Sequence, residues 1–271
     1  MPEIAEVETV RRTLKRSILN KKIKDVNILY PKMIVSNIDE FKKIKDQSFK
    51  DILRRGKWLI FELDNNYLLS HLRMEGKYFL KDYGEEINKH EHVIFTFSDN
   101  TDLRYHDVRK FGQMILINKE DIDKVPQLQK QGIEANDPKL SASYLKEKFK
   151  NKSSPIKSSL LDQTIISGLG NIYADEVLFN AKVYPLKKSS ELNDQELKNI
   201  ATSSIEVANK AIEMGGTTIK SYTSSLGVTG RFQQELKVHT RAGKECLVCK
   251  SIIEKVKVGG RSTYYCPKCQ K

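Results

Sequence analysis

The chain has 271 residues, which is enough for two domains or one large domain. It has no run of 18 or more apolar residues and no basic-then-apolar N-terminal segment. This excludes a membrane-spanning helix and a signal peptide, so we expect a soluble cytoplasmic protein. The formal net charge is +12, and residues 237–271 hold nine Lys and Arg residues against two Glu. Such a basic segment favours a nucleic-acid partner over a generally lysine-rich composition without one.

Residues 3–18 show the spacing of an amphipathic helix. Apolar side chains recur at steps of three and four residues, at Ile4, Val7, Val10, Leu14 and Ile18. Pro2 suits the first helical turn, where its missing N–H costs no hydrogen bond. Glu3 and Glu6 favour the positive end of the helix dipole. The pattern therefore predicts a helix that begins almost at the first residue.

Short apolar runs separated by turn signals follow this helix. They predict strands at residues 22–30, 58–63, 67–72, 92–98, 101–108 and 113–118. The turn residues Asp64, Asn65 and Asn66 lie between the second and third of these runs and predict a hairpin. We therefore expect this half to be β-rich, with helices at its edges.

The pattern turns helical beyond a boundary that we place at about residues 130–155. A lysine-rich helix is expected at 139–152, and Pro155 ends it because proline disfavours helix at the preceding residue. Residues 159–181 are expected to be helical with a break at 167–171 (SGLGN). Residues 193–214 form the next predicted helix, which Gly215 and Gly216 stop, and residues 217–240 are expected to form a loop.

All four cysteines lie in the last 26 residues and form two C-x2-C pairs separated by 16 residues. They are Cys246, Cys249, Cys266 and Cys269. The spacing is typical of a four-thiolate zinc site, and the gap is long enough for a β-hairpin. Disulfides are the alternative, but a reducing compartment disfavours them. No further cysteine and no close histidine offers an open coordination position, so we predict one structural Zn²⁺.

The N-terminus offers a possible nucleophile. If the initiator Met is removed, Pro2 becomes the first residue, and an α-amino group titrates near pH ~8. Such an amine can attack a sugar aldehyde to form a Schiff base. Glu3 and Glu6 lie one turn apart on the same face of the predicted helix, and neighbouring carboxylates split their pKa values, so one can hold a proton. From these residues alone, an ordinary helix start remains the stronger interpretation.

The opening MPEIAEVETVRR resembles the MPELPEVETxRR opening of bacterial formamidopyrimidine-DNA glycosylases. Further matching blocks follow in the family's order: GKWLIFEL, HLRMEGK, KHEHVIF, DVRKFG, SGLGNIYADEVLF, MGGTT, GRFQQEL and GRSTYYCPKCQK. Because these blocks span nearly the whole chain, we identify it as a member of that family. Each block alone would be a weak signal.

The resemblance implies an α+β fold of two domains. An N-terminal β-sandwich-like catalytic domain flanked by helices would span residues 1–130. A helical domain with a helix–two-turn–helix element would span 131–240 and include a lesion-capping loop at about 217–237. A β-hairpin zinc finger would span 241–271. The implied partner is double-stranded DNA with oxidised bases or abasic sites, no membrane is involved, and the expected state is a monomer.

The resemblance also implies base-excision repair by a bifunctional enzyme. Such an enzyme removes oxidised purines, such as 8-oxoguanine and formamidopyrimidines, from duplex DNA and cuts the abasic site by β,δ-elimination. Pro2 would form a Schiff base at the sugar C1′, Glu3 would open the sugar ring as an acid, and Glu6 would assist. Lys57 matches the proton donor of β-elimination. Arg261 matches the residue assigned to δ-elimination, but an arginine stays protonated, so we expect it to clamp the phosphates beside the lesion.

Further positions match the family's DNA contacts. A glycosylase must take its target nucleotide out of the stack, and the resemblance assigns the gap-filling wedge to Met74, Arg109 and Phe111. By residue type alone, Met74 and Phe111 would be ordinary core residues. The remaining expected DNA contacts are His71, His90, Lys152, Lys157 and Asn171.

Three positions depart from the usual family pattern. Ala5 replaces a proline, and Arg73 and Glu75 stand where smaller residues are common, but none of these changes removes a catalytic group. Two alternative functions remain. One is an endonuclease VIII-like enzyme for oxidised pyrimidines, against which Ile4 argues because a glycine is typical there. The other is a non-catalytic zinc-ribbon protein that binds DNA.

Overall fold

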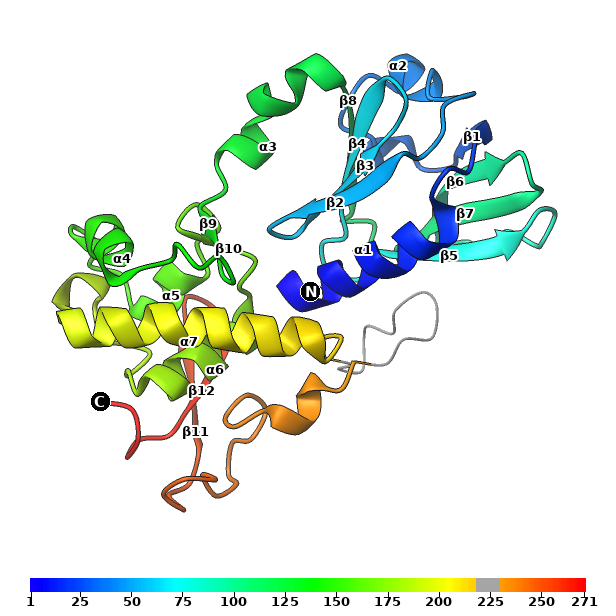
Figure 1. Ribbon diagram of the computed structural model, residues 1–271. Coiled ribbons are helices and arrows are strands. Elements are labelled where there is room, and N and C mark those ends of the chain that lie inside the picture. The colour runs from blue at the N-terminus through cyan, green and yellow to red at the C-terminus, as the bar shows by residue number, and fades with distance from the viewer. Residues whose placement is uncertain (218–229) are drawn as a thin grey trace. The chain divides into compact units, whose positions relative to one another are not determined.

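The structure is a computed structural model that describes residues 1–217 and 230–271, and Figure 1 shows its helices and strands. The described residues divide into two compact units. The first holds Met1–Gln129 with Thr217 and Gly230, and the second holds Lys130–Gly216 with Arg231–Lys271. None of the described helices combines the length and the apolar character that a bilayer crossing requires. Most of the expected lesion-capping loop, residues 218–229, lies outside the described residues.

The first unit contains two antiparallel four-stranded sheets. Their strands are, in spatial order, β1 (Ile23–Ile28), β6 (Glu91–Phe97), β7 (Thr101–His106) and β5 (Lys77–Asp82) in one sheet, and β2 (Asp51–Arg55), β3 (Trp58–Glu62), β4 (Asn66–His71) and β8 (Gln113–Asn118) in the other. Helix α1 (Ile4–Ile18) contacts β2 and β3. This arrangement confirms the predicted sandwich-like layer with helices at its edges.

One apolar core joins α1 to both sheets. Val7, Val10 and Leu14 of the helix lie in the same buried cluster as side chains from all parts of the sandwich. Phe49 packs edge-on against Phe61 of one sheet and Phe97 of the other, at ring distances of 5.5 and 5.8 Å. The rigid sandwich therefore holds the N-terminal end of the chain through the helix that follows it.

The second sheet is also covered on its other face. A smaller buried cluster there includes Trp58, Leu69 and Ile115. The segments that cover it are η2 (Lys119–Lys124) and α3 (Pro126–Gln129), which follow β8. The unit also has two short elements before β2, η1 (Pro31–Met33) and α2 (Ile38–Lys42). Because both faces are covered, β3 reads as a continuous apolar run rather than an alternating one.

Helices dominate the second unit (Figure 1). They are α4 (Ala142–Phe149), α5 (Ile156–Leu160), α6 (Asn171–Ala181) and α7 (Asp194–Glu213), with the short turns η3 (Ser189–Glu191) and η4 (Phe232–Glu235). Helix α6 is buried on most sides and contacts α5, α7 and the C-terminal hairpin. That hairpin pairs β11 (Glu254–Val258) with β12 (Arg261–Tyr265), and a short parallel pair joins β9 (Ile133–Glu134) to β10 (Ile166–Ser167).

Several boundaries differ from the sequence prediction. Helix α1 begins at Ile4 with Glu3 as its N-cap, so Pro2 precedes the helix instead of lying in its first turn. Strands β2 and β5 were not predicted, because charged residues interrupt their apolar pattern. The helical stretch predicted at 159–181, with a break at 167–171, has a longer and earlier break: residues 161–170 form turns and the short strand β10 between α5 and α6.

Candidate active site and nucleic-acid interface

The start of α1 is held by Glu6. Its Oε2 accepts a hydrogen bond from the backbone N–H of Glu3 at 2.8 Å. Its Oε1 accepts two more from Thr217, from the backbone N–H at 2.7 Å and from the hydroxyl at 3.0 Å. Glu3, Glu6 and Thr217 are all buried. Glu6 therefore fixes the backbone beside Pro2 and also holds Thr217, a residue that the sequence did not single out.

The N-terminal amine lies in a desolvated and charged environment. Its pKa is lowered from the ordinary value, chiefly because burial disfavours the ammonium form. The charge of Lys57 acts in the same direction, whereas Glu3, Glu6 and Glu75 oppose it. In this structure the amine belongs to Met1, and removal of Met1 would transfer the amine to Pro2. The predicted residues Glu3, Glu6 and Lys57 thus share one electrostatic environment with the chain terminus.

Lys57 lies in the tight turn between β2 and β3. The turn needs Gly56, whose φ of 56° lies in the left-handed region that favours glycine. Lys57 is only 4% exposed, so it is not a solvated lysine at a strand edge. The register of β2 and β3 pairs Arg55 with Trp58, which closes the hairpin around Lys57.

His71 lies opposite Trp58 on the neighbouring strand. The two rings pack edge to face with centroids 4.8 Å apart. Burial, and then the charges of Arg73 and Lys57, lower the pKa of His71 to about 3. The Nδ1 atom accepts the backbone N–H of Arg73 at 2.9 Å, so the neutral ring carries its proton on Nε2. His71 is therefore a fixed, uncharged N–H donor, which suits a contact with a phosphate oxygen.

Asp107 organises the loop that carries Arg109 and Phe111. Its buried carboxylate accepts hydrogen bonds from the backbone N–H groups of Arg109, Phe111 and Gly112 at 2.8–3.0 Å. The guanidinium of Arg109 lies 4.8 Å from the centre of the Phe111 ring. Phe111 is 52% exposed, so the alternative of a core phenylalanine is wrong. Sequence analysis missed Asp107, although an Asp before a glycine-containing loop is a known turn former.

A second loop, which carries half-buried Met74, meets the first one at Tyr105. A Cβ atom at Gly76 would lie 2.1 Å from the Tyr105 hydroxyl, and a Cβ atom at Gly112 would lie 1.8 Å from it. Both positions therefore require glycine. Arg73 adds a direct link between the loops, because its Nη2 donates to Oε1 of Gln113 at 2.8 Å. The three predicted wedge residues thus lie on two loops that share one support.

His90 is the remaining DNA contact that was predicted in the first unit. Its ring packs against His106 with centroids 5.6 Å apart. The Nδ1 atoms of both rings are buried without a hydrogen-bond partner among the described residues. Burial and the charge of His90 lower the pKa of His106. The pair is half-buried, which leaves His90 partly accessible.

Lys157 in the second unit faces inward. Its side chain is fully buried, and its ammonium pairs with Asp175 and donates to the backbone carbonyl of Asn171 at 3.0 Å. We expected Lys157 to face DNA directly, and this burial is inconsistent with that expectation. Lys152 differs, because its side chain is 37% exposed and pairs with Asp162 at 3.1 Å.

Asn171 and Arg261 belong to neighbouring parts of the second unit. Asn171 is the first residue of α6, and its Nδ2 donates to the carbonyl of Ser262 on β12 at 2.9 Å. Its Oδ1 is buried and has no hydrogen-bond partner among the described residues. Arg261 is exposed next to the hairpin turn, where Gly259 and Gly260 have positive φ angles. The helix start and the hairpin are therefore joined directly.

A buried network behind Asn171 was not predicted. Asp175 holds Lys157 with one oxygen and the Nδ1 atom of His239 with the other, the latter at 2.6 Å. Glu176 accepts backbone N–H groups from residues 237–239 at 2.8–3.0 Å, and burial raises its pKa. His239 also packs edge-on against Tyr264 of β12. No sequence spacing links these residues, because they come from distant segments.

The four cysteines form the predicted metal site. Their Sγ atoms all lie within 4.8 Å of one another, and none is in a disulfide. The Cys249–Cys266 and Cys246–Cys269 sulfur atoms are 3.4 and 3.9 Å apart. Tetrahedral zinc with bonds of about 2.3 Å would place sulfurs ~3.8 Å apart, so the four thiolates fit one structural Zn²⁺.

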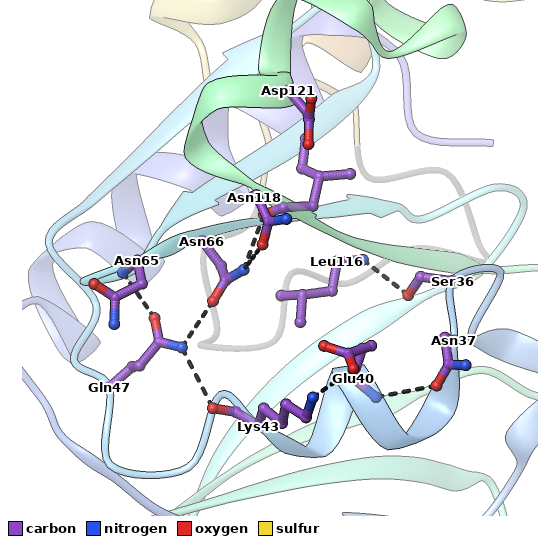
Figure 2. A pocket seen from close by; sticks show the side chains of 11 residues that line it. Ser36, Asn37, Glu40, Lys43, Gln47, Asn65, Asn66, Leu116, Asn118 and Asp121 are labelled. Atoms are coloured by element: carbon purple, nitrogen blue, oxygen red, sulfur yellow. Dashed lines mark hydrogen bonds and ion pairs between the residues drawn. The ribbon is translucent and has the colours of Figure 1, made fainter.

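A cleft of about 510 Å³ lies elsewhere in the first unit (Figure 2). Its amide side chains bond to one another. The Nε2 atom of Gln47 donates to Asn66 at 2.8 Å, and the Nδ2 atom of Asn66 donates to Asn118 at 3.1 Å. The backbone N–H of Asn65 donates to Gln47 at 2.9 Å. None of the predicted site residues lines this cleft, so we assign these amides a structural role.

Comparison with known proteins identifies three consecutive domains. Family models match residues 1–114 as a formamidopyrimidine-DNA glycosylase N-terminal domain and residues 131–223 as its H2TH domain. A third model matches residues 243–271 as a zinc finger found in FPG and IleRS. The formamidopyrimidine-DNA glycosylase of Exiguobacterium sibiricum is 48% identical, over 100% of this chain and 99% of the relative. That of Listeria innocua is 44% identical over all of both chains.

Solved structures agree with these matches. A mutant FPG of Lactococcus lactis, in complex with Fapy-dG-containing DNA, superposes with a TM-score of 0.94 at 40% identity over all of both chains. The L. lactis Fpg complex with abasic-site DNA gives a TM-score of 0.93 at 41% identity over 99% of each chain. The expected fold, family and zinc finger are thereby confirmed. The chain belongs to the formamidopyrimidine-DNA glycosylase family, the DNA glycosylases of base-excision repair.

Proposed function

We propose that this protein removes oxidised purines from duplex DNA and then cuts the strand at the resulting abasic site. The observation that carries the proposal is the group of charged side chains around the chain terminus: Glu3, Glu6 and Lys57 act on the amine, which is Met1's here and has a pKa lowered by burial. A lowered pKa increases the neutral fraction at physiological pH, and only the neutral amine is a nucleophile. The relatives named above are formamidopyrimidine-DNA glycosylases, and the structural neighbours were solved with Fapy-dG and abasic-site DNA.

The chemistry would begin at Pro2 after removal of Met1. The amine attacks the sugar C1′ while the bond from C1′ to the damaged base breaks and the base leaves with a proton. Glu3 gives a proton to the ring oxygen, the ring opens, and an iminium forms between Pro2 and C1′. The Glu3 carboxylate then takes the C2′ proton as the 3′ phosphate leaves, and loss of the C4′ proton to water expels the 5′ phosphate. Water finally hydrolyses the iminium, which frees the Pro2 amine. Glu6 keeps the helix start in place through its bonds to Glu3 and Thr217.

Lys57 and Arg261 would act on the charges that develop. Lys57 is a buried ammonium in the environment of the amine, and it can donate a proton during β-elimination. Arg261 is exposed next to the hairpin turn, and its guanidinium presents a planar fork of N–H donors. We therefore assign it to binding the phosphates beside the lesion and stabilising the leaving phosphate.

The other predicted residues would hold the DNA. His71 offers a neutral N–H donor, Asn171 a side-chain amide and Lys152 a partly exposed ammonium for the phosphates. His90 would add a contact from its half-buried position. The loops that meet at Tyr105 would supply the wedge residues Met74, Arg109 and Phe111. Lys157 would act indirectly, through the Asn171 carbonyl that it holds.

Borohydride trapping tests the proposal. The protein, with Met1 removed, should form a covalent complex with abasic-site DNA when the iminium is reduced, and Pro2→Gly should abolish efficient trapping. Trapping that persists undiminished in Pro2→Gly would exclude Pro2 as the nucleophile. Excision should also be faster on 8-oxoguanine opposite cytosine than on thymine glycol. The reverse preference would assign the protein to oxidised pyrimidines instead.

A further inference from the structure

A single carboxylate on α1 gathers three arginines. Glu8 is buried, and its two oxygens accept hydrogen bonds from Arg11 at 2.8 and 3.0 Å, from Arg12 at 2.8 Å and from Arg54 at 3.1 Å. Arg11 and Arg12 lie on the same helix, whereas Arg54 lies on β2. The hydrogen bonds and charges of these arginines lower the pKa of Glu8 against the effect of burial. The carboxylate is therefore a fixed anchor between helix and sheet.

Arg54 connects this anchor to the turn that carries Lys57. Its Nε donates to Glu8, and its Nη1 donates to the carbonyl oxygen of Gly56 at 2.9 Å. The Arg54 side chain is 8% exposed, so water competes little for either bond. A guanidinium is planar, and its donors are fixed relative to one another. Because one side of the guanidinium bonds to helix α1 and the other side bonds to the turn, Arg54 fixes the distance between the helix and the turn.

The bond to Gly56 acts on Lys57 through the peptide plane. The carbonyl that Arg54 holds belongs to the peptide unit joining Gly56 to Lys57, and that unit is planar. Holding the oxygen therefore restricts the rotation of the peptide and the direction in which the Lys57 side chain leaves the backbone. Gly56 has a φ of 56°, and glycine can adopt many other backbone conformations as easily. The hydrogen bond from Arg54 therefore helps to keep this peptide in one conformation.

A second link runs from the same anchor to the same strand. Arg11 pairs with Glu8 through Nε and Nη2, and its Nη1 donates to the backbone carbonyl of Ile52 on β2 at 3.1 Å. Burying several charged groups is costly, and a well-packed apolar set often gives equal stability. We therefore interpret these ion pairs as positioning contacts, which hold α1 at a fixed place relative to the hairpin of β2 and β3.

We infer that Glu8 and Arg54 are positioning residues that set Lys57 relative to the N-terminal nucleophile. The inference rests on the proposed function, since it assumes that the amine and Lys57 act on the same sugar. Neither residue needs to touch DNA. Arg54 acts on the reaction through the Gly56–Lys57 peptide, and Glu8 acts through Arg54.

The test compares Arg54→Met with Arg12→Met. Both variants remove a guanidinium that pairs with Glu8, but Arg12 is 49% exposed and bonds to no turn carbonyl among the described residues. The measurement is the single-turnover cleavage rate of abasic-site duplex at saturating enzyme. We expect Arg54→Met to lower this rate about tenfold to a hundredfold, because a displacement of about 1 Å can cost that much. Arg12→Met should stay within about twofold of the wild type.

Two further readouts separate positioning from folding and from binding. The affinity for tetrahydrofuran-containing duplex should change less than about threefold in Arg54→Met, because no DNA contact is removed. Trp58 is the only tryptophan of the chain and follows Lys57 directly, so its fluorescence emission should shift in Arg54→Met and stay unchanged in Arg12→Met.

Arg54→Lys keeps the positive charge without the planar fork. We expect it to remain slow, and it replaces Arg54→Met as the test if the latter does not fold.

The outcomes are decisive in each direction. The inference would be overturned if Arg54→Met or Arg54→Lys cleaved at the wild-type rate. It would also be overturned if Arg54→Met and Arg12→Met lost the same fraction of the cleavage rate. A loss confined to DNA affinity would also overturn it, since Arg54 would then be a binding residue. A wild-type protein that neither traps nor cleaves abasic DNA contradicts the proposed function instead, before any variant is compared.

Discussion

Two regions, the loops around Glu6 and Asp107 in the first unit and the surroundings of Lys157 in the second, hold their functional side chains by different means. In the first unit, buried carboxylates accept hydrogen bonds from the backbone, as Glu6 does at the helix start and Asp107 does in the Phe111 loop. In the second unit, ionised side chains meet one another away from water, as Lys157 and Asp175 do. Four cysteine sulfurs gather there as well.

The difference predicts how each region responds to a substitution. Losing a carboxylate that caps a loop leaves neutral N–H groups without their acceptor, which costs about 1–3 kcal/mol. A buried ion pair or a metal site leaves uncompensated charge when one member is lost. The surroundings of Lys157 and the cysteine cluster should therefore respond to single changes more sharply than the Phe111 loop.

The largest effect should come from removing the metal. Without zinc the four thiolates have nothing to join them, and structural zinc sites contribute about 10–16 kcal/mol of apparent binding free energy. We expect the β11–β12 hairpin to lose its shape and the affinity for tetrahydrofuran-containing duplex to fall about tenfold or more. Fluorescence anisotropy after chelation, and again after adding Zn²⁺, measures this change. Undiminished binding by the metal-free protein would show that the hairpin needs no zinc.

Lys157→Met should give the next largest effect. It leaves the carboxylate of Asp175 buried without its ammonium partner, so we expect a loss of about 3–5 kcal/mol in the free energy of unfolding. Lys152→Met is the matched control, because Lys152 also pairs with an aspartate but is 37% exposed. That variant should lose less than about 1 kcal/mol. Equal losses in urea unfolding would remove the distinction between buried and exposed pairs.

His71 should make the stability of the first unit depend on pH. Its pKa is about 3 in the folded protein and about 6.5 in a model peptide, so the unfolded chain binds the extra proton between these values. Stability should therefore fall as the pH drops from 6.5, by at most about 1.4 kcal/mol per pH unit from this group. His71→Gln should show a shallower decline below pH 6.5 and a parallel profile above it. Parallel profiles throughout would mean that His71 does not titrate in this way.

Asp107→Ala should have the smallest effect on stability. The variant frees three backbone N–H groups of the Phe111 loop, and we expect a loss of about 1–3 kcal/mol. Asp99→Ala is the control, since Asp99 caps the N–H of Thr101 in an exposed turn. The change in melting temperature compares the two variants. A loss in Asp107→Ala as large as that of Lys157→Met would contradict the proposed contrast between the two regions.

Much of the site could be predicted from residue types and motifs. The cysteine spacing is local, so it indicated a zinc site before any packing was known. The opening segment and the blocks that follow it indicated the family. Charge and apolar periodicity indicated a β-rich half followed by a helical half. Strands were missed where charged residues break the alternation, as in β2, and where a strand has only two residues, as in β10.

The roles of individual charged residues could not be predicted in the same way. Lys152 and Lys157 are close in the sequence and alike in chemistry, yet one is partly exposed and the other is fully buried beside Asp175. Phe111 and Met74 have core-like side chains, but the glycines that pack against Tyr105 shape their loops. Burial depends on contacts between segments far apart in the chain, which no local pattern encodes.

Residue types alone specify the groups that are present: a proline that becomes the first residue if Met1 is removed, acidic residues beside it, and four thiols at the spacing of a zinc site. Only the folded structure shows how these groups are positioned. Lys57 is buried, Glu6 accepts hydrogen bonds from Thr217, and Arg54 links Glu8 to the Gly56 carbonyl. The physical reason is that reactive groups are set by residue type, whereas their orientation and pKa are set by neighbours that only folding brings into contact.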